Sequence, residues 1–345
     1  MFLHAVKRLQ SQAPTMPTAW LMGACMEAKG KQELWTMRKP EVLAALREQA
    51  VIQSAESSNR MEGVTVAPGR LRPILLGKSK PRDRSEEELV GYRKALQWIH
   101  TRNPEPLEPG VILRLHALSQ GGFAGDAGKW KKRDNEIIEY GERGEPVVRF
   151  KPTSAKATPD AVHTLCIVYR DFCDKERLPP LLAITTFVFD FLCVHPFRDG
   201  NGRVSRLLTT LLLQQHGFEV VRYLSLERLI EESKADYYEV LKRCSKGWHD
   251  GKNEIVPWWN YMLGILKNAY GEFSSRVERF GAIGKADLVR TAVLRQEAAF
   301  TVSTIATACP SVSVPYIRKV LKQMRSKGEV AVQGYGRGAK WTLLA

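Results

Sequence analysis

One stretch of this chain, residues 195–206, reads His-Pro-Phe-Arg-Asp-Gly-Asn-Gly-Arg-Val-Ser-Arg. The apolar segment before it is predicted to be a helix that ends near Val194, because the proline at 196 disfavours helical backbone in the residue that precedes it. Gly200 and Gly202 then allow a tight turn. The sequence therefore predicts a helix, a short loop, and a second helix whose N-terminus faces the loop.

The start of that second helix has the properties of an anion-binding site. Its first N–H groups lack helical partners and carry a partial positive charge. Arg203 and Arg206 are three positions apart and so share one helix face, where two guanidinium groups suit a polyphosphate. Asp199 offers a carboxylate for Mg²⁺, and His195 offers a titratable base. Taken singly, such residues are more often structural, and it is their combination that indicates a site.

These residues match, at every specified position, the signature His-Pro-Phe-x-[Asp/Glu]-Gly-Asn-Gly-Arg-x-x-Arg. In this respect the chain resembles the Fic family, and the resemblance extends from about Leu46 to about Leu266. It implies a mainly α fold, a helical bundle that carries a β-hairpin flap. It also implies a protein adenylyltransferase, which moves AMP from ATP onto a Ser, Thr or Tyr hydroxyl of a protein, its own included, and releases pyrophosphate.

The resemblance assigns a role to each polar residue of the loop. His195 would be the general base that takes the proton of the attacking hydroxyl, and Asp199 would bind Mg²⁺. The β- and γ-phosphates of ATP would be held by Arg203 and Arg206.

The same resemblance places an anion hole in the loop, formed by the backbone of Gly200, Asn201 and Gly202 and by the Asn201 side chain. The two glycines leave room for ATP in the orientation usual for the family, which favours AMP transfer over transfer of phosphocholine or phosphate. Further along the chain, Tyr237 and Tyr238 resemble tyrosines near the adenine pocket of the family. Ordinary packing explains such a pair equally well.

A glycine-rich segment, residues 121–158, interrupts the helical pattern. It contains β-prone runs at 136–140 and 147–150 and is predicted to form a β-hairpin. It resembles the flap that aligns the target segment by strand addition.

A second informative stretch, residues 58–63, reads Ser-Asn-Arg-Met-Glu-Gly at the end of a helix predicted over about 41–63. Ser58 and Glu62 are four positions apart and so lie on one helix face. A solvated helix end with a glycine cap would look the same. Beside the signature above, the stretch resembles the Fic inhibitory motif, [Ser/Thr]-x-x-x-Glu-[Gly/Asn]. The resemblance implies an inhibitory ion pair between Glu62 and Arg206; in some family members this glutamate serves in removal of AMP from modified proteins.

Three proline breakers predict an irregular N-terminal extension over residues 1–40. The Fic domain is then expected over residues 41–280, and glycines at 281 and 284 mark a hinge. Within that domain Ser85 and Glu88 have the spacing of a helix capping box.

The C-terminal segment, residues 284–345, is predicted to be a small winged helix-turn-helix domain. A short helix over 301–308 precedes a basic helix that begins after Ser313, and β-like runs follow at 329–333 and 340–344. From residue 282 onward ten Lys or Arg stand against three Asp or Glu. This excess favours duplex DNA as a partner. A module for protein contact or homodimer formation, with solvated charges, explains the pattern equally well.

Composition sets the remaining expectations. The formal net charge is +15, which fits any acidic partner. No apolar run approaches the ~20 residues that cross a bilayer, and no signal-peptide pattern is present, so a cytoplasmic protein without a membrane partner is expected. Six scattered cysteines without a CxxC pair are expected to be free thiols. Three hypotheses stand: an autoinhibited AMP-transferase, a DNA-binding regulator with a Fic sensor core, and a related transfer or AMP removal.

Overall fold

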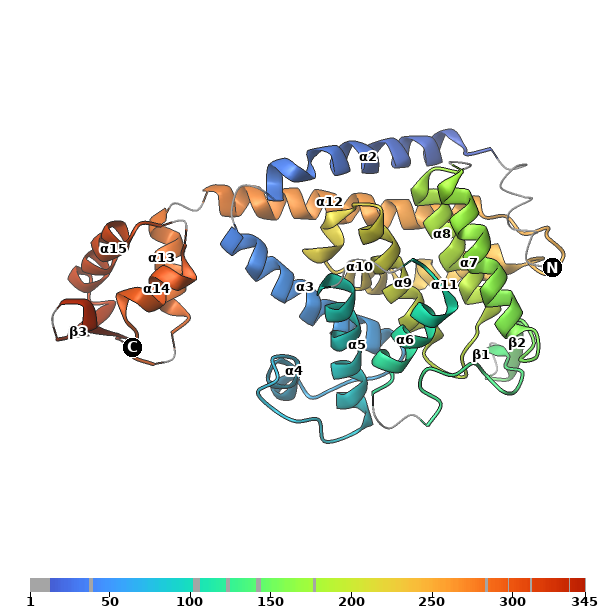
Figure 1. Ribbon diagram of the computed structural model, residues 1–345, viewed down its shortest axis with the longest axis horizontal. Helices are drawn as coiled ribbons and strands as arrows, with labels where there is room; N and C mark the ends of the chain where they lie inside the picture. Colours follow the sequence, from blue (N-terminus) through green and yellow to red (C-terminus); the bar gives the residue numbers. More distant parts are fainter. Residues whose placement is uncertain are drawn as a thin grey trace. The chain divides into compact units, whose positions relative to one another are not determined.

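Figure 1 shows the computed structural model of the chain, which is mainly helical, as predicted. The chain divides into two compact units: unit 1 comprises residues 1–32 and 47–271, and unit 2 comprises residues 33–46 and 272–345. The structure describes residues 13–36, 40–101, 106–121, 125–140, 144–175, 178–282, 285–296, 298–310, 312–334 and 336–344.

The N-terminal segment is helical over much of its length, which corrects the expectation of an irregular extension over residues 1–40. Helix α2 (Met16–Thr36) begins with Pro17 in its first turn, where proline is tolerated because the N–H groups there have no helical partner. The buried Cys25 thiol donates to the Leu263 carbonyl of α12 (Val256–Ala282), and the two helices run side by side in Figure 1. Residues 1–12 and 37–39 of the predicted extension lie outside the described residues.

Unit 1 is built around two buried helices, α8 (Pro180–Val194) and α9 (Asn201–Gln215). Every residue of α8 after Pro180 is buried, and α8 packs against both α7 and α9. Because the helices on both sides of the 195–200 loop belong to the core, the loop itself is held in place. The remaining helices of the bundle are α3 (Pro40–Met61), α4 (Pro68–Leu75), α5 (Arg84–Thr101), α6 (Pro109–Ser119), α7 (Thr158–Asp174), α10 (Leu226–Glu232) and α11 (Lys234–Ser245).

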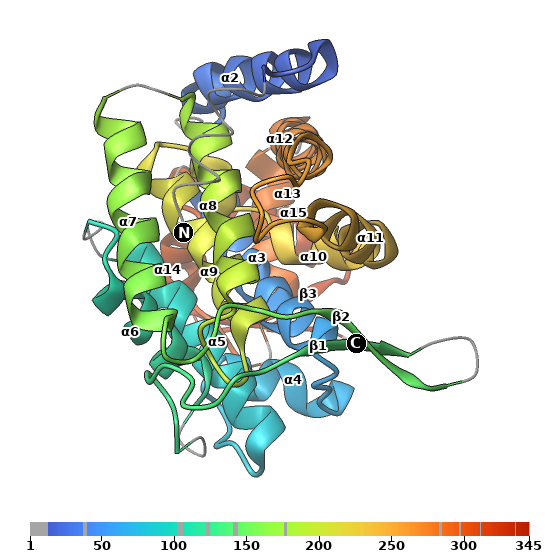
Figure 2. The same cartoon turned by 90° about the vertical axis from the view of Figure 1, so that its right-hand side faces the viewer.

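The predicted hairpin is present within the glycine-rich segment. Strands β1 (Ile137–Tyr140) and β2 (Pro146–Phe150) pair antiparallel, with a register shift between Ile137 and Ile138. Figure 2 shows this hairpin projecting from the helices of unit 1.

Unit 2 contains the predicted C-terminal helices and strand pair. Helices α13 (Lys285–Leu294), α14 (Val302–Ala308) and α15 (Val314–Ser326) are followed by β3 (Val330–Gln333) and β4 (Lys340–Leu343), which pair antiparallel. The apolar stripe of α15 is buried in a core formed by these elements. The polar face of α15 is therefore left toward solvent.

Two general expectations can be compared with the structure. None of the described helices is long and apolar enough to cross a membrane. All six cysteines are free thiols, as expected, and five of them are buried.

Candidate active site

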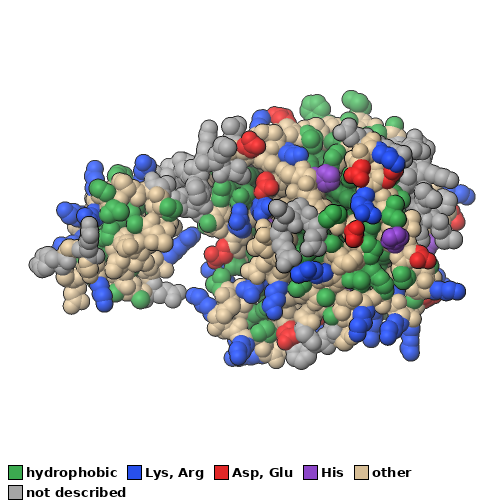
Figure 3. All heavy atoms as spheres, in the orientation of Figure 1, with side chains coloured by type: hydrophobic (Ala, Val, Ile, Leu, Met, Phe, Trp, Pro, Cys, Tyr) green, Lys and Arg blue, Asp and Glu red, His purple; other side chains and the backbone are tan. Residues whose placement is uncertain are grey.

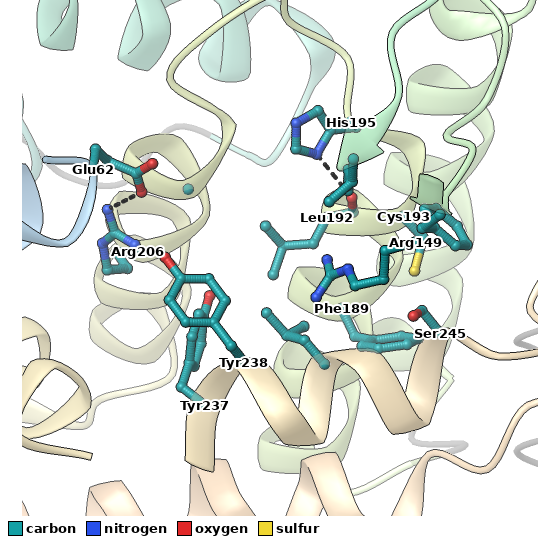
Figure 4. A pocket seen from close by; sticks show the side chains of 14 residues that line it. Glu62, Arg149, Phe189, Leu192, Cys193, His195, Arg206, Tyr237, Tyr238 and Ser245 are labelled. Carbon is teal, nitrogen blue, oxygen red and sulfur yellow. Dashed lines mark hydrogen bonds and ion pairs between the residues drawn. The ribbon is translucent and has the colours of Figure 1, made fainter. Parts of the chain in front are cut away.

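His195 ends α8 in an unusual backbone conformation. Its φ is 50° and its ψ is 61°, in the left-handed region, and it is the one non-glycine residue with positive φ among those the structure describes. Such backbone is costly outside glycine and is held here because α8 on one side and the loop on the other are both fixed. The turn directs the imidazole away from the helix and into a cavity (Figure 4).

The hydrogen bonding of His195 defines its protonation state. Its Nδ1 lies 3.2 Å from the Leu192 carbonyl oxygen, and since a carbonyl only accepts, Nδ1 carries the proton and Nε2 keeps its lone pair. Burial, assisted by the nearby Lys131 and Arg149 cations, lowers the pKa of His195 to about 4. The imidazole is therefore neutral near pH 7, with Nε2 available to accept a proton.

Asn201 closes the loop on itself. Its side-chain oxygen accepts from the Phe197 N–H at 2.9 Å, and its side-chain nitrogen donates to the Phe197 carbonyl at 2.8 Å. Phe197 is fully buried and stacks on His116 with ring centroids 3.7 Å apart. The Asn201 side chain, expected in an anion hole, thus serves loop closure in this structure, and the backbone N–H groups at the start of α9 remain for an anion.

Backbone conformation favours glycine at position 200, and a close approach requires it at position 202. Gly200 has φ 82°, a conformation that suits glycine. A Cβ added to Gly202 would lie 2.2 Å from Oε1 of Glu62. The Glu62 carboxylate therefore lies directly over the first turn of α9.

Glu62 and Arg206 form the ion pair that the sequence predicted. Nη2 of Arg206 donates to Oε1 of Glu62 at 2.7 Å and to the Ser58 carbonyl at 2.9 Å, while Nε donates to the Ser58 hydroxyl at 2.8 Å. Burial alone would lower the pKa of Arg206, but the Glu62 carboxylate together with Tyr92 and Tyr237 outweighs it and holds that pKa above its usual range. The end of α3 therefore holds both groups of the predicted inhibitory motif against the guanidinium.

Arg203 has a different environment from Arg206, and the expectation that both arginines hold phosphates stays a prediction. Its side chain is 1% exposed, and Nη1 donates to Oε2 of Glu88 at 2.8 Å. Arg203 does not line the cavity that contains Arg206 and His195. The ion pair with Glu88 joins α9 to α5, so Arg203 is held as part of the bundle.

The start of α5 also differs from the predicted capping box of Ser85 and Glu88. Helix α5 begins at Arg84, and the Asp83 carboxylate accepts from the Glu86 N–H at 2.9 Å. Glu88 lies one turn further along, where it accepts from both Arg203 and Arg84.

Asp199 is exposed at the mouth of the loop. One carboxylate oxygen accepts from the Gly200 N–H at 2.7 Å, and the other accepts from Arg84 at 3.0 Å. The described residues contain no group of three or more His, Cys, Asp or Glu that could hold a metal ion. A lone exposed carboxylate fits Mg²⁺, because this ion is commonly held by one or two carboxylates together with substrate phosphates and water.

One cavity unites most of the predicted residues. His195, Gly202, Arg206 and Glu62 surround one part of it, and apolar side chains of α8 and α11 line another (Figure 4). The predicted tyrosines also lie here: the buried Tyr237 and the partly exposed Tyr238 meet edge to face, with ring centroids 5.2 Å apart. The site combines a base, a cation, helix N–H groups and an aromatic wall.

Three further residues support the site and were not predicted. Lys131, before the hairpin, donates its backbone N–H to the Pro196 carbonyl at 2.9 Å and its ammonium to the Val194 carbonyl at 3.3 Å. His116 accepts from the Gly128 N–H at Nδ1 and so donates from Nε2 to the Asp199 carbonyl at 3.1 Å. Arg149 of β2 lines the cavity. No local sequence pattern marks them, because each reaches the loop from an element distant in sequence.

Fold and site together define a helical protein in which a loop at a helix N-terminus faces an acidic side chain. Within this class, the model of the Fic/DOC family matches residues 106–213 of the chain. It is 23% identical over 211 residues to protein adenylyltransferase Fic of Nematostella vectensis, covering 58% of this chain and 44% of that protein. It is 26% identical over 200 residues to protein adenylyltransferase fic-1 of Caenorhabditis elegans, covering 54% of this chain and 35% of that protein. The chain thus spans less than half the length of these relatives.

Solved structures support the fold. A Fic family protein from Desulfovibrio desulfuricans G20 superposes with a TM-score of 0.65 at 21% identity, covering 96% of this chain and 97% of that one. A Fic domain-containing signaling protein from Bacteroides thetaiotaomicron gives a TM-score of 0.64 at 23% identity, covering 74% of this chain and 97% of that one.

Proposed function

We propose that this protein transfers the AMP part of ATP to a Ser, Thr or Tyr hydroxyl of a protein. The observation that carries the proposal is the cavity in which the free Nε2 of His195, the N-terminus of α9 and the Arg206 guanidinium face one another. Curated relatives that are named protein adenylyltransferases support the same reaction class. The Fic domain would cover residues 41–280.

The reaction follows from these groups. Nε2 of His195 takes the proton of the target hydroxyl as its oxygen forms a bond to the α-phosphorus of ATP. The bond between that phosphorus and the bridging oxygen breaks, and pyrophosphate leaves with the electron pair. The N–H groups of α9 and the Arg206 guanidinium stabilise negative charge on the phosphates. The Tyr237 and Tyr238 wall receives the adenine, and the hairpin aligns the target segment by strand addition.

Mg²⁺ would be held at Asp199, whose exposed carboxylate lies beside the loop. When bound, the ion would neutralise phosphate charge. Arg84 donates a hydrogen bond to that carboxylate and would compete with Mg²⁺ for it, because one carboxylate oxygen binds each cation more weakly when both are present.

Glu62 would act as an inhibitor of this reaction. It occupies the Arg206 guanidinium and lies over Gly202, so its charge takes the place of a phosphate. Ser58 supports this arrangement by holding Arg206 from the same helix end. The same carboxylate could instead serve removal of AMP from a modified protein, which remains the alternative reaction at this site.

Intact mass after incubation with ATP and Mg²⁺ tests the proposal on the wild type, Glu62→Gly, and Glu62→Gly with His195→Ala. We expect Glu62→Gly to gain one or more AMP masses, and the gain to vanish when His195 is also changed. No gain in any form, with added candidate proteins also unmodified, would contradict AMP transfer and leave AMP removal as the function to test.

We propose a second function, duplex DNA binding, for residues 284–345 as a winged helix-turn-helix domain. Helix α15 buries its apolar stripe and exposes Arg318, Lys319, Lys322 and Arg325, and its sequence contains no acidic residue. Lys and Arg side chains stand around the visible face of unit 2 in Figure 3. Such a face suits phosphate contacts along a duplex.

Fluorescence anisotropy with a labelled 20-base-pair duplex tests this second function. We expect binding that weakens steeply with salt and is lost in Lys319→Glu with Lys322→Glu. The matched control is Lys78→Glu with Lys80→Glu, which reverses the charge of two exposed cations of unit 1. Equal losses in both variants, or no binding by the wild type, would leave protein contact or dimer formation as the role of this segment.

A further inference from the structure

The flap strand β2 contains a bulge at a single residue. Ile137 pairs with Phe150 and Ile138 pairs with Val148, so Arg149 has no partner across the hairpin. In a regular strand, neighbouring side chains point to opposite faces. Here Arg149 and Phe150 both line the same cavity, because the extra residue turns the strand. Bulges of this kind commonly re-aim a side chain next to an active site.

The strand is fixed directly after the bulge. Phe150 stacks on His249 with ring centroids 5.4 Å apart. Nε2 of His249 donates to the Lys151 carbonyl at 2.7 Å. These contacts hold the end of β2 against the loop that follows α11, and so the direction of the Arg149 side chain is set by the fold.

The Arg149 guanidinium points into the cavity between His195 and Tyr238 (Figure 4). Its Nε is buried and has no hydrogen-bond partner among the residues that the structure describes, while the side chain as a whole is only partly buried. A guanidinium that reaches a cavity beside the His195 imidazole is suited to an anionic ligand.

The site otherwise has fewer cations than the sequence indicated. Arg203 is turned into the bundle and neutralised by Glu88, so it does not reach the cavity. Arg206 is the cation that the signature itself supplies there. A nucleotide triphosphate carries more negative charge than one guanidinium and the N–H groups of α9 can balance.

We infer that Arg149 is a phosphate-binding residue of the nucleotide site, delivered from the flap by the β2 bulge, in the place that the sequence assigns to Arg203. This inference rests on the proposed use of ATP. It places Arg149 beside the phosphate that lies closest to His195, across the cavity from Arg206. The flap would then contribute to nucleotide binding as well as to alignment of the target.

The test measures ATP binding by calorimetry in full-length protein that cannot turn over, Glu62→Gly with His195→Ala. We expect Arg149→Ala to weaken ATP binding about tenfold or more, and Arg149→Lys to restore part of it because charge is kept while the planar fork is lost. The matched control is Lys151→Ala, a flap cation whose side chain is 73% exposed and pairs with Glu136. This control should bind ATP like the parent.

A second readout separates phosphate contact from a structural effect. Loss of a cation that contacts phosphate makes ATP affinity less sensitive to salt, so Arg149→Ala should show a shallower dependence on salt than Lys151→Ala. Equal ATP affinity, or equal salt dependence, in the two variants would overturn the inference. Absence of ATP binding by the parent would instead contradict the proposed function.

Discussion

Oε1 of Glu62 lies 2.7 Å from Nη2 of Arg206, and the same atom would be 2.2 Å from a Cβ on Gly202. One carboxylate oxygen therefore accepts a hydrogen bond from the Arg206 guanidinium and also covers the N-terminus of α9. Any phosphate that uses both groups must displace it. The strength of inhibition should then depend on the charge of residue 62 as well as on its size.

The first prediction concerns that charge. Glu62→Gln keeps the length of the side chain but replaces the ion pair with Arg206 by a weaker hydrogen bond from the guanidinium to a neutral amide oxygen. We expect AMP incorporation to rise above the wild type, about tenfold, but to stay below that of Glu62→Gly. Incorporation of radiolabelled AMP from ATP into the wild type, Glu62→Gln and Glu62→Gly measures the difference.

A matched control is available on the same helix. Glu56→Gln makes the identical chemical change where the carboxylate pairs with Arg60 outside the cavity. This variant should incorporate AMP like the wild type. Equal rises in the two variants would show that general loss of negative charge, and not release of Arg206, causes the activation.

The second prediction concerns the buried pair of Arg203 and Glu88. Removing Glu88 leaves the buried Arg203 with Asp199 alone, at 3.7 Å, and removing Arg203 leaves the buried Glu88 with Arg84 alone, so each change costs up to about 3–5 kcal/mol. Glu88→Ala and Arg203→Ala should each lower the free energy of unfolding by that order, and the double variant should lose less than their sum. Urea denaturation of the four proteins measures the cycle. An Arg203→Ala protein of unchanged stability and weakened ATP binding would restore a phosphate-binding role for Arg203.

Local patterns predicted much of the fold. Pro196, the loop glycines and the apolar run before them predicted α8, the loop and α9, because proline and glycine constrain the backbone whatever the tertiary context. The flap strands followed from short β-prone runs between glycines. Helix α2 was missed, because Pro17 was taken as a breaker although it occupies a first turn, where proline is compatible with a helix.

The site was predictable where a short motif marks its residues. The pair of Glu62 and Arg206 was predicted because two separate stretches each resemble a motif of the Fic family. Helical spacing alone did not predict the ion pair of Arg203, since residues three apart on a helix share a face but need not have the same neighbours. Its environment is decided by Glu88 of α5. Arg149 reaches the cavity because of a bulge in β2, and a run of β-prone residues does not reveal such a shift in strand register.

The third prediction concerns catalysis and pH. In the proposed reaction the neutral form of His195 accepts the proton, so activity should be lost as pH falls through its pKa. Because burial lowers that pKa to about 4, kcat/KM of Glu62→Gly for ATP should change less than about twofold between pH 7 and pH 5.5. An ordinary histidine, with a pKa near 6.5, would retain roughly a tenth of its neutral form at pH 5.5. A tenfold fall over this range would show that the imidazole titrates normally.

The fourth prediction concerns stability and pH. Burial lowers the pKa of His100, His116 and His195 to about 4 each. Between about pH 6.5 and pH 4 the unfolded chain therefore binds protons at these positions that the folded chain does not bind. Stability should then fall on acidification through this range, by up to roughly 1.4 kcal/mol per pH unit for each histidine.

Urea midpoints at pH 7.0 and pH 5.0 measure this fall, and His100→Gln isolates one contribution. Nδ1 of His100 lies 2.8 Å from the Gln214 side-chain oxygen, so the substitution has its own cost at both pH values. The difference between the two midpoints is the quantity that matters, because a constant cost cancels from it. This difference should be smaller in His100→Gln than in the wild type, since one proton-binding group is gone. Identical differences would mean that His100 titrates alike in the folded and unfolded chains, contrary to its burial.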